Sequence, residues 1–160
     1  MSRNGEARRW PVVLGVLLVP AIIAVIAAVL ILPQLWVVAV NDASAREVET
    51  SLRDLPLPED TEFIDSLSVA AKLSGNGNGM QYLGALLIRS DLSLEELETF
   101  YESQAGEELS MIGVHPSGGL DGLHRTPGFL GQPGEPGTFI VSAWGDGPGW
   151  FFSDADLRGH

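Results

Sequence analysis

The stretch PVVLGVLLVPAIIAVIAAVLIL, residues 11–32, decides the organisation of this 160-residue chain. It lies within a longer segment, residues 10–41, that contains no charged side chain. Its 22 residues extend about 33 Å as an α-helix, which is enough to cross the roughly 30 Å hydrocarbon core of a bilayer. A small domain rarely buries a helix that is apolar on every side. We therefore predict a transmembrane anchor over residues 11–40, with residues 11–32 in contact with the lipid bilayer.

Charges on the two sides of this segment predict its orientation. Ahead of it, three arginines accompany a single acid: Arg3, Arg8, Arg9 and Glu6. The first charge behind it is Asp42. Because positively charged flanks remain on the cytoplasmic side, residues 1–10 are expected inside the cell. The sequence thus predicts a single-pass protein of the plasma membrane with its C-terminal domain outside.

A cleaved signal peptide is the alternative interpretation of the same segment. Ala43, Ser44 and Ala45 fit the small-x-small pattern of a cleavage site, and the basic N-terminus fits a signal peptide too. The apolar stretch is, however, much longer than the roughly 7 to 15 residues of a signal-peptide core. An uncleaved anchor is therefore the main prediction, and a secreted protein cleaved after Ala45 is the alternative.

Composition narrows the classes of partner. Residues 41–160 contain 20 acidic side chains and 6 basic ones. Such an excess of negative charge argues against binding to nucleic acid, whose phosphates would be repelled, and against docking on anionic lipid. The chain has no cysteine, so disulfides and thiol chemistry are excluded. An outward-facing domain without disulfides, in a chain rich in arginine, alanine and glycine, is typical of bacteria.

Beyond the anchor, periodicity predicts one small α+β domain over residues 59–153. A helical stalk with a proline linker, residues 41–58, is expected before it, and a polar tail, residues 154–160, after it. The expected strands cover residues 62–73, 80–89, 109–114 and 138–144, with a possible edge strand at 150–152. One helix is expected between the second and third strands. This ββαββ order predicts a two-layer sandwich, in which one helix packs on a mostly antiparallel sheet.

Local patterns support these elements. In the first strand, alternate positions form an apolar face: Phe63, Leu67, Val69, Ala71 and Leu73. The GNGNG sequence at residues 75–79 is typical of a hairpin turn, because glycine and asparagine tolerate positive φ. Ser93 and Glu96 have the spacing of a capping box, which predicts that the helix begins there.

The Gly/Pro-rich loop at residues 115–137 holds the few candidates for chemistry. His115, Asp121 and His124 are weak candidates for a metal site, since zinc prefers such ligands but their spacing matches no recognised pattern. No serine lies in a Gly-x-Ser-x-Gly elbow, and no nucleotide-binding fingerprint is present. We therefore predict neither a cofactor nor a catalytic site. An envelope hydrolase or metal-dependent enzyme that uses the loop histidines is the alternative.

Aromatic residues near the C-terminus are candidates for partner binding: Trp144, Trp150, Phe151 and Phe152. Exposed aromatic rings are common where a protein contacts a glycan or another polypeptide. Packing of two terminal strands explains the same residues more simply. The predicted function is a membrane-anchored, non-enzymatic domain that binds a partner protein or a component of the cell envelope.

Overall fold

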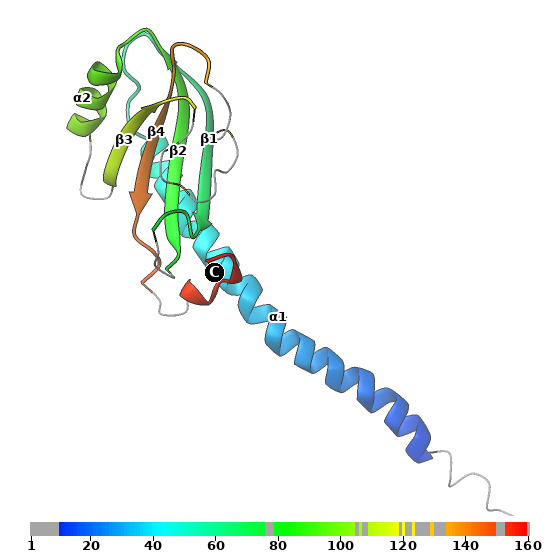
Figure 1. The fold of residues 1–160 in the computed structure, drawn as a ribbon. Helices are drawn as coiled ribbons and strands as arrows, with labels where there is room; N and C mark the ends of the chain where they lie inside the picture. The colour runs from blue at the N-terminus through cyan, green and yellow to red at the C-terminus, as the bar shows by residue number, and fades with distance from the viewer. Residues whose placement is uncertain are drawn as a thin grey trace, which may run out of the picture. The chain divides into compact units, whose positions relative to one another are not determined.

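The computed structural model describes residues 10–75, 79–104, 106, 109–118, 120, 123, 129, 134–149 and 153–159. The chain divides into two compact units, Met1–Trp36 and Val37–His160. In chain order the elements are α1 (Trp10–Arg53), β1 (Thr61–Ala71), β2 (Gln81–Ser90), α2 (Leu94–Gln104), β3 (Ser110–Pro116) and β4 (Thr138–Gly145), followed by the short 3-10 helices η2 (Ser153–Ala155) and η3 (Leu157–Gly159) (Figure 1).

The first unit consists of the apolar part of α1. Its large side chains are exposed rather than packed, and Val29 and Leu30 each leave 66% of their surface uncovered. Pro20 and Pro33 both lie inside the helix. Over Leu18–Arg53, α1 is long and apolar enough to cross a membrane. The prediction of one long apolar helix near the N-terminus is therefore confirmed.

The second unit is built on a four-stranded antiparallel sheet in the order β1-β2-β4-β3 (Figure 1). β2 lies inside the sheet, and its residues 82–86 are buried on both faces, as expected for an apolar strand covered on both sides. β4 separates β2 from β3, so α2 connects two strands that are not neighbours. The predicted α+β class, with an antiparallel sheet and a packed helix, is confirmed.

Two helices cover one face of the sheet. The C-terminal part of α1 contributes Ala45, Val48 and Leu52 to the same core cluster as Leu97 and Tyr101 of α2. The sequence predicts a stalk and linker outside the domain for residues 41–58. In the structure their apolar stripe is instead a central part of the core, because the sheet offers it an apolar surface to cover.

Glycines let α1 approach the sheet closely. A β-carbon at Gly84 of β2 would lie 2.6 Å from the amide nitrogen of Glu49 in α1. A β-carbon at Gly145 of β4 would overlap the side chain of Val48. The helix backbone therefore rests almost directly on these two strands.

The N-terminus of α2 has the predicted capping box. The amide nitrogen of Ser93 donates to Glu96 Oε2 over 2.8 Å, and the amide of Glu96 donates back to the Ser93 hydroxyl over 3.3 Å. The Ser93 hydroxyl also donates to Glu96 Oε2 over 2.7 Å. This bond and the one from the Ser93 amide stabilise the charged carboxylate, so the pKa of Glu96 lies below its ordinary value. The pattern seen in the sequence therefore fixes the start of the helix.

One predicted side-chain direction is wrong. Residues Leu67, Val69, Ala71 and Leu73 pack together in one cluster, but Phe63 belongs to the cluster beneath the helices. The cause is a β-bulge: Phe63 pairs with Ile88 and Asp65 pairs with Leu87, so Ile64 is the extra residue. A bulge reverses the alternation of side chains beyond it. Strict alternation along the sequence therefore placed Phe63 on the wrong face.

Candidate functional site: a cavity beneath the Gly/Pro-rich loop

The described residues of the segment between β3 and β4 cover part of the second face of the sheet. Leu120, Leu123 and Phe129 of this loop pack in a cluster with residues such as Leu83 and Ile140. These strand positions alternate with those that face the helices, so they lie on the opposite side of the sheet. The loop therefore acts as a cover, and it leaves a cavity at one place.

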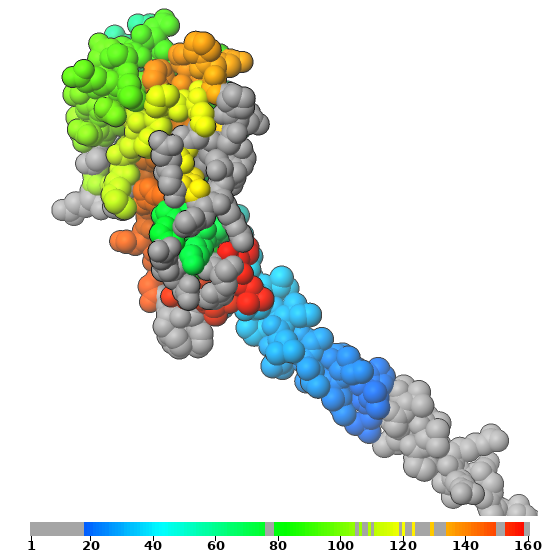
Figure 2. Space-filling view, in the orientation of Figure 1, coloured from blue at the N-terminus to red at the C-terminus, as the bar shows by residue number. Residues whose placement is uncertain are grey.

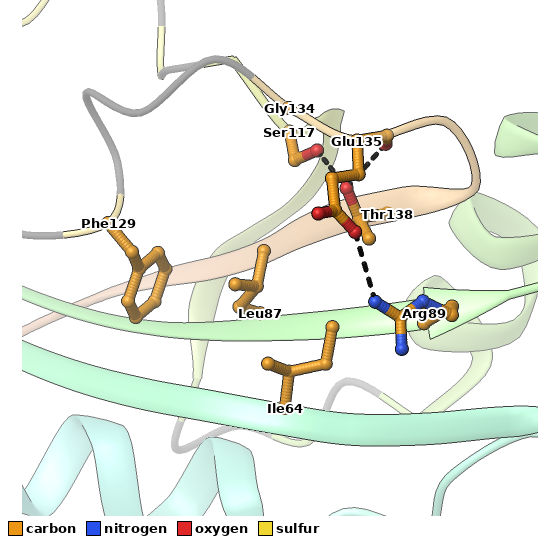
Figure 3. Close-up of a pocket in the computed structure, with 8 residues that line it drawn as sticks. All are labelled: Ile64, Leu87, Arg89, Ser117, Phe129, Gly134, Glu135 and Thr138. Atoms are coloured by element: carbon orange, nitrogen blue, oxygen red, sulfur yellow. Dashed lines mark hydrogen bonds and ion pairs between the residues drawn. The ribbon is translucent and has the colours of Figure 1, made fainter.

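This cavity has a volume of about 250 Å³ and opens to solvent. Drug-sized ligands occupy pockets of roughly 300 to 1,000 Å³, so the space suits one or two side chains better than a large substrate. Strands β1, β2 and β4 contribute to its wall together with the loop (Figure 3). Its lining consists of Ile64, Leu87, Arg89, Ser117, Phe129, Gly134, Glu135 and Thr138.

One end of the cavity is apolar. Ile64 from β1 and Leu87 from β2 lie side by side there, and Phe129 of the loop lies across from Leu87 (Figure 3). Ile64 is the extra residue of the β1 bulge and remains 38% exposed. Bulges often redirect a side chain at a functional surface. Here the bulge leaves a partly exposed isoleucine as part of the floor.

The other end is charged. Arg89 of β2 forms ion pairs of 3.2 Å with both Glu62 and Glu135. Half of the Arg89 side chain is exposed and the carboxylates are more so, so each pair contributes little to stability. With two carboxylates beside one guanidinium, this rim has a net negative charge. It would attract a cationic group of a partner.

Backbone contacts fix the end of the loop beside the cavity. The Ser117 amide donates to the carbonyl of Thr138 over 3.0 Å, and the Thr138 hydroxyl donates to the carbonyl of Glu135 over 2.6 Å. The hydroxyls of Ser117 and Thr138 also bond each other. A β-carbon at Gly134 would overlap the carbonyl oxygen of Ser117. Only glycine therefore fits where the two ends of the loop cross.

Of the three candidate metal ligands, His115 alone lies in the described residues. His115 lies in β3 and lines a different, smaller cavity with Glu98 and Glu102 of α2. Asp121 and His124 lie outside the described residues. Among the residues that the structure does describe, no group of three metal-binding side chains is close enough to hold an ion. The metal-enzyme alternative gains no structural support from His115.

Among the candidate aromatic residues, only Trp144 falls in the described part of the chain. It lies in β4, is half-buried and packs against the cluster beneath the loop. Trp150, Phe151 and Phe152 lie outside the described residues, as does the expected edge strand that they would form. Trp144 thus belongs to the same face as the cavity, and it lines no part of it.

Sequence reasoning missed a buried polar cluster at the C-terminus. Asn41 of α1 donates to Asp156 over 3.0 Å and accepts a hydrogen bond of 2.8 Å from the Tyr82 hydroxyl. Arg158 bonds both Asp156, at 2.6 Å, and Asp42, at 2.7 Å. The C-terminal residues therefore lie against α1 (Figure 2). The predicted polar tail is in fact tied to the core.

Titration properties follow from this burial. Burial alone would raise the pKa of Asp156, but hydrogen bonds from Arg158 and Asn41 and the charge of Arg158 outweigh it and lower the pKa to about 2. The hydrogen bond and charge of Asp156 raise the pKa of Arg158 in turn. Asn41 and Asp156 are both fully buried, so the cluster is a structural connection and not an open site. The sequence gives one sign of this cluster, the polar residue Asn41 at the end of the charge-free segment.

Comparisons with known proteins identify no relative of this chain. No protein-family model matches the chain, and neither a curated protein nor a solved structure matches it. The class of protein is therefore inferred from the fold, the cavity and the apolar helix.

Proposed function

We propose that the protein is a single-pass membrane protein whose extracytoplasmic domain binds a partner polypeptide of the cell envelope and catalyses no reaction. The observation that carries the proposal is the exposure of apolar side chains along α1. Ile23, Val25 and Val29 each leave 60% or more of their surface uncovered. A soluble protein rarely exposes so large a contiguous apolar surface, whereas a bilayer covers it.

The position of the second unit adds to this proposal. It begins at Val37, directly after Trp36, the last residue of the first unit. The helix α1 runs through this boundary to Arg53. If residues 11–32 cross a bilayer, the domain is tethered to that membrane, and its partner is expected in the same compartment. The basic N-terminus, with Arg3, Arg8 and Arg9, is expected to remain in the cytoplasm, which would put the domain on the outer side of the membrane.

The cavity beneath the loop suggests what the partner presents. Its floor is apolar, with Ile64 and Leu87, and its rim has Glu135 beside Arg89, which also pairs with Glu62 next to the cavity. An apolar side chain next to a lysine or arginine would fill the floor and meet the two carboxylates. Interfaces commonly combine one buried apolar anchor with a polar rim. We propose that the partner carries such a pair.

Two experiments test the proposal in the full-length chain. The first measures protease access to a C-terminal tag. It compares cells that have lost their outer layers but keep an intact plasma membrane with lysed cells. Access in intact cells is expected, together with recovery of the chain in the membrane fraction. A tag that is protected until lysis would contradict the orientation, and recovery in the soluble fraction would contradict the anchor.

The second experiment places a photocrosslinking amino acid at Ile64 and, as a control, at Leu57. Both side chains are partly exposed, at 38% and 42%, but Leu57 does not line the cavity. One discrete adduct is expected from position 64 and none from position 57. The adduct should disappear when Glu62 and Glu135 are both changed to glutamine. Equal labelling from both positions would contradict a binding site at the cavity.

A further inference from the structure

The sheet has two edge strands, β1 and β3, which differ in how well they are protected (Figure 1). β3 contains Pro116 and packs against α2, and its central residue Val114 is only 4% exposed. Proline and a covering helix are common ways of protecting an edge strand. β1 extends over 11 residues without a proline, and its residues 66–69 are only half-buried. β1 is therefore the edge that another strand can join.

The hydrogen bonds of the sheet identify which backbone groups of β1 point outward. The Ser117 amide donates to the Thr138 carbonyl, so alternate residues of β4 bond β3 and the residues between them bond β2. When the same alternation is followed through the register of β2, Leu67 and Val69 of β1 bond β2. The N–H and C=O groups of Ser68, which lies between them, therefore point away from the sheet.

These outward groups are not paired with another strand in the described part of the chain. The Ser66 amide, on the same edge as Ser68, donates over 2.8 Å to the carboxylate of its own neighbour, Asp65. No described residue bonds the outward backbone groups of Ser68. Ser68 also lines a cavity of about 330 Å³ beside α1 that opens to solvent. An incoming strand would therefore find both backbone partners and space at this edge.

The outer edge of β1 leads directly to the cavity beneath the loop. Ile64 lies in the floor of that cavity and comes just before Asp65, where regular pairing with β2 resumes after the bulge. Regular pairing continues to Ala71, a length of roughly 20 Å in a strand. Because side chains of an added strand would alternate between the two faces of the sheet, every second one would point to the face with the cavity.

Charge favours a basic segment over a second copy of this chain. The first half of β1 has two exposed acids, Glu62 and Asp65. Lysine or arginine across from them would form the opposite-charge pairs that stabilise neighbouring strands. A second copy would instead bring its own excess of 20 acidic over 6 basic side chains in residues 41–160, and the two domains would repel each other.

We infer that the partner polypeptide binds as an extended, basic segment that adds a strand along the outer edge of β1, with one apolar side chain in the cavity beneath the loop. Main-chain hydrogen bonds to groups such as those of Ser68 would supply affinity, and the cavity and the acids would select the sequence. The inference rests on the proposed function, which supplies the partner. It adds the conformation of the bound segment and the backbone contacts that hold it.

The test uses the full-length chain with the photocrosslinking amino acid at Ile64, in the cells in which the protein is made. Ser68→Pro removes the outward N–H group without removing a hydrogen bond to β2. The matched control is Ser68→Ala, which removes the hydroxyl and keeps the N–H group. The yield of the adduct should fall about fivefold with Ser68→Pro, as expected for the loss of one hydrogen bond, and should not change with Ser68→Ala. Thermal unfolding in detergent checks that each variant keeps its fold.

Amide hydrogen exchange, followed by NMR, gives a second measurement that needs no substitution at Ser68. In the free chain the Ser68 amide should exchange faster than the amides of Leu67 and Val69, which bond β2. In the purified adduct its exchange should slow at least about tenfold, because the added strand accepts its hydrogen bond. Equal exchange of the Ser68 amide in the free chain and in the adduct would overturn the inference. Full adduct yield from a folded Ser68→Pro variant would do the same.

These measurements also separate the inference from the proposed function. If the wild type gives no discrete adduct from position 64, the binding site at the cavity is overturned, and strand addition with it. If the adduct forms but neither its yield nor the exchange of the Ser68 amide responds as expected, strand addition alone is overturned. An adduct with twice the mass of this chain would overturn the basic partner as the occupant, because it would identify a second copy.

Discussion

Gly84 of β2 lies directly beneath the backbone of Glu49 in α1, and a β-carbon at position 84 would stand 2.6 Å from the Glu49 nitrogen and 2.7 Å from its α-carbon. Ala143 of β4 is the cross-strand partner of Gly84, so small residues form the floor on which the helix rests. The contact joins backbone to backbone, which no change of rotamer can relieve. The docking of α1 onto the sheet therefore depends on the absence of a side chain at this position.

Gly84→Ala is expected to destabilise the domain by about 3 kcal/mol, the upper end of the usual range for overpacking, because the obstructing atoms belong to a helix backbone. Chemical unfolding of the full-length chain in detergent measures this loss. The control is Gly106→Ala, since no atom lies within 4 Å of a β-carbon there. A loss of under about 1 kcal/mol for Gly84→Ala would show that α1 does not rest on the sheet as described.

Because of the C-terminal polar cluster, we expect the free energy of unfolding to depend on pH in the acidic range. Asp156 has a pKa of about 2 in the folded protein, against 3.8 ordinarily. As pH falls, the unfolded chain takes up the proton first, so the stability that Asp156 contributes is present above about pH 4 and is lost toward about pH 2. Asp156→Asn should lower the free energy of unfolding near neutral pH by about 2 kcal/mol, because Arg158 and Asn41 lose a charged acceptor.

The difference between Asp156→Asn and the wild type should vanish below about pH 2, where the wild-type carboxyl is protonated too. Asp146→Asn serves as the control, because Asp146 is exposed in the turn after β4. If Asp156→Asn unfolded with the same free energy as the wild type at neutral pH, the tail would not be tied to α1 through this carboxylate.

The two tyrosines of the chain predict opposite responses to loss of the hydroxyl. Both are buried, but Tyr82 donates to Asn41 over 2.8 Å, whereas the Tyr101 hydroxyl has no partner within the described residues. Tyr82→Phe should therefore cost about 1 to 2 kcal/mol, since a buried acceptor on Asn41 is left unpaired. Tyr101→Phe should be neutral or slightly stabilising, because it removes a buried polar group that gains no hydrogen bond.

Alkaline titration gives a second measurement on the same pair. Burial raises the pKa of Tyr101 to about 12, so as pH rises above about 10 the unfolded chain loses its proton first and stability falls. Tyr101→Phe should show a smaller fall in the free energy of unfolding over this range. A clear destabilisation by Tyr101→Phe near neutral pH would mean that its hydroxyl has a partner after all.

Much of this fold was predictable because local patterns determine it. The capping box at Ser93 predicted the start of α2, and the alternation of apolar residues from Leu67 to Leu73 predicted one face of β1. A helix was predicted within residues 41–58, and α1 continues to Arg53. The docking of its apolar stripe, Ala45, Val48 and Leu52, onto the sheet was not predicted, because a stripe shows that a surface must be covered and does not identify what covers it.

The cavity beneath the loop was less predictable. A bulge at Ile64 shifts the register of β1 by one residue, and nothing in the alternation of the sequence marks where the shift falls. The ion pairs of Arg89 with Glu62 and Glu135 join residues 27 and 46 positions apart. Such contacts depend on the pairing of strands across the sheet, which composition and spacing do not encode.

The crossing of the loop ends at Gly134 gives a final prediction about the proposed binding site. A β-carbon at Gly134 would overlap the Ser117 carbonyl oxygen. Gly134→Ala must therefore push the two segments apart, and the cavity between them loses the shape that the partner's side chain fits. The expected result is a strong decrease in crosslinking from position 64, with a loss of stability of about 1 to 3 kcal/mol. Crosslinking yield and unfolding are measured on the same full-length variant.

Gly118→Ala is the matched control, because Gly118 lies next to Ser117 and no atom lies within 4 Å of a β-carbon there. It should leave both the crosslink and the stability unchanged. If Gly134→Ala lost stability but kept the crosslink at full yield, the partner would contact Ile64 without entering the cavity. Binding would then depend on the exposed bulge of β1 itself, and the loop would serve only to cover the sheet.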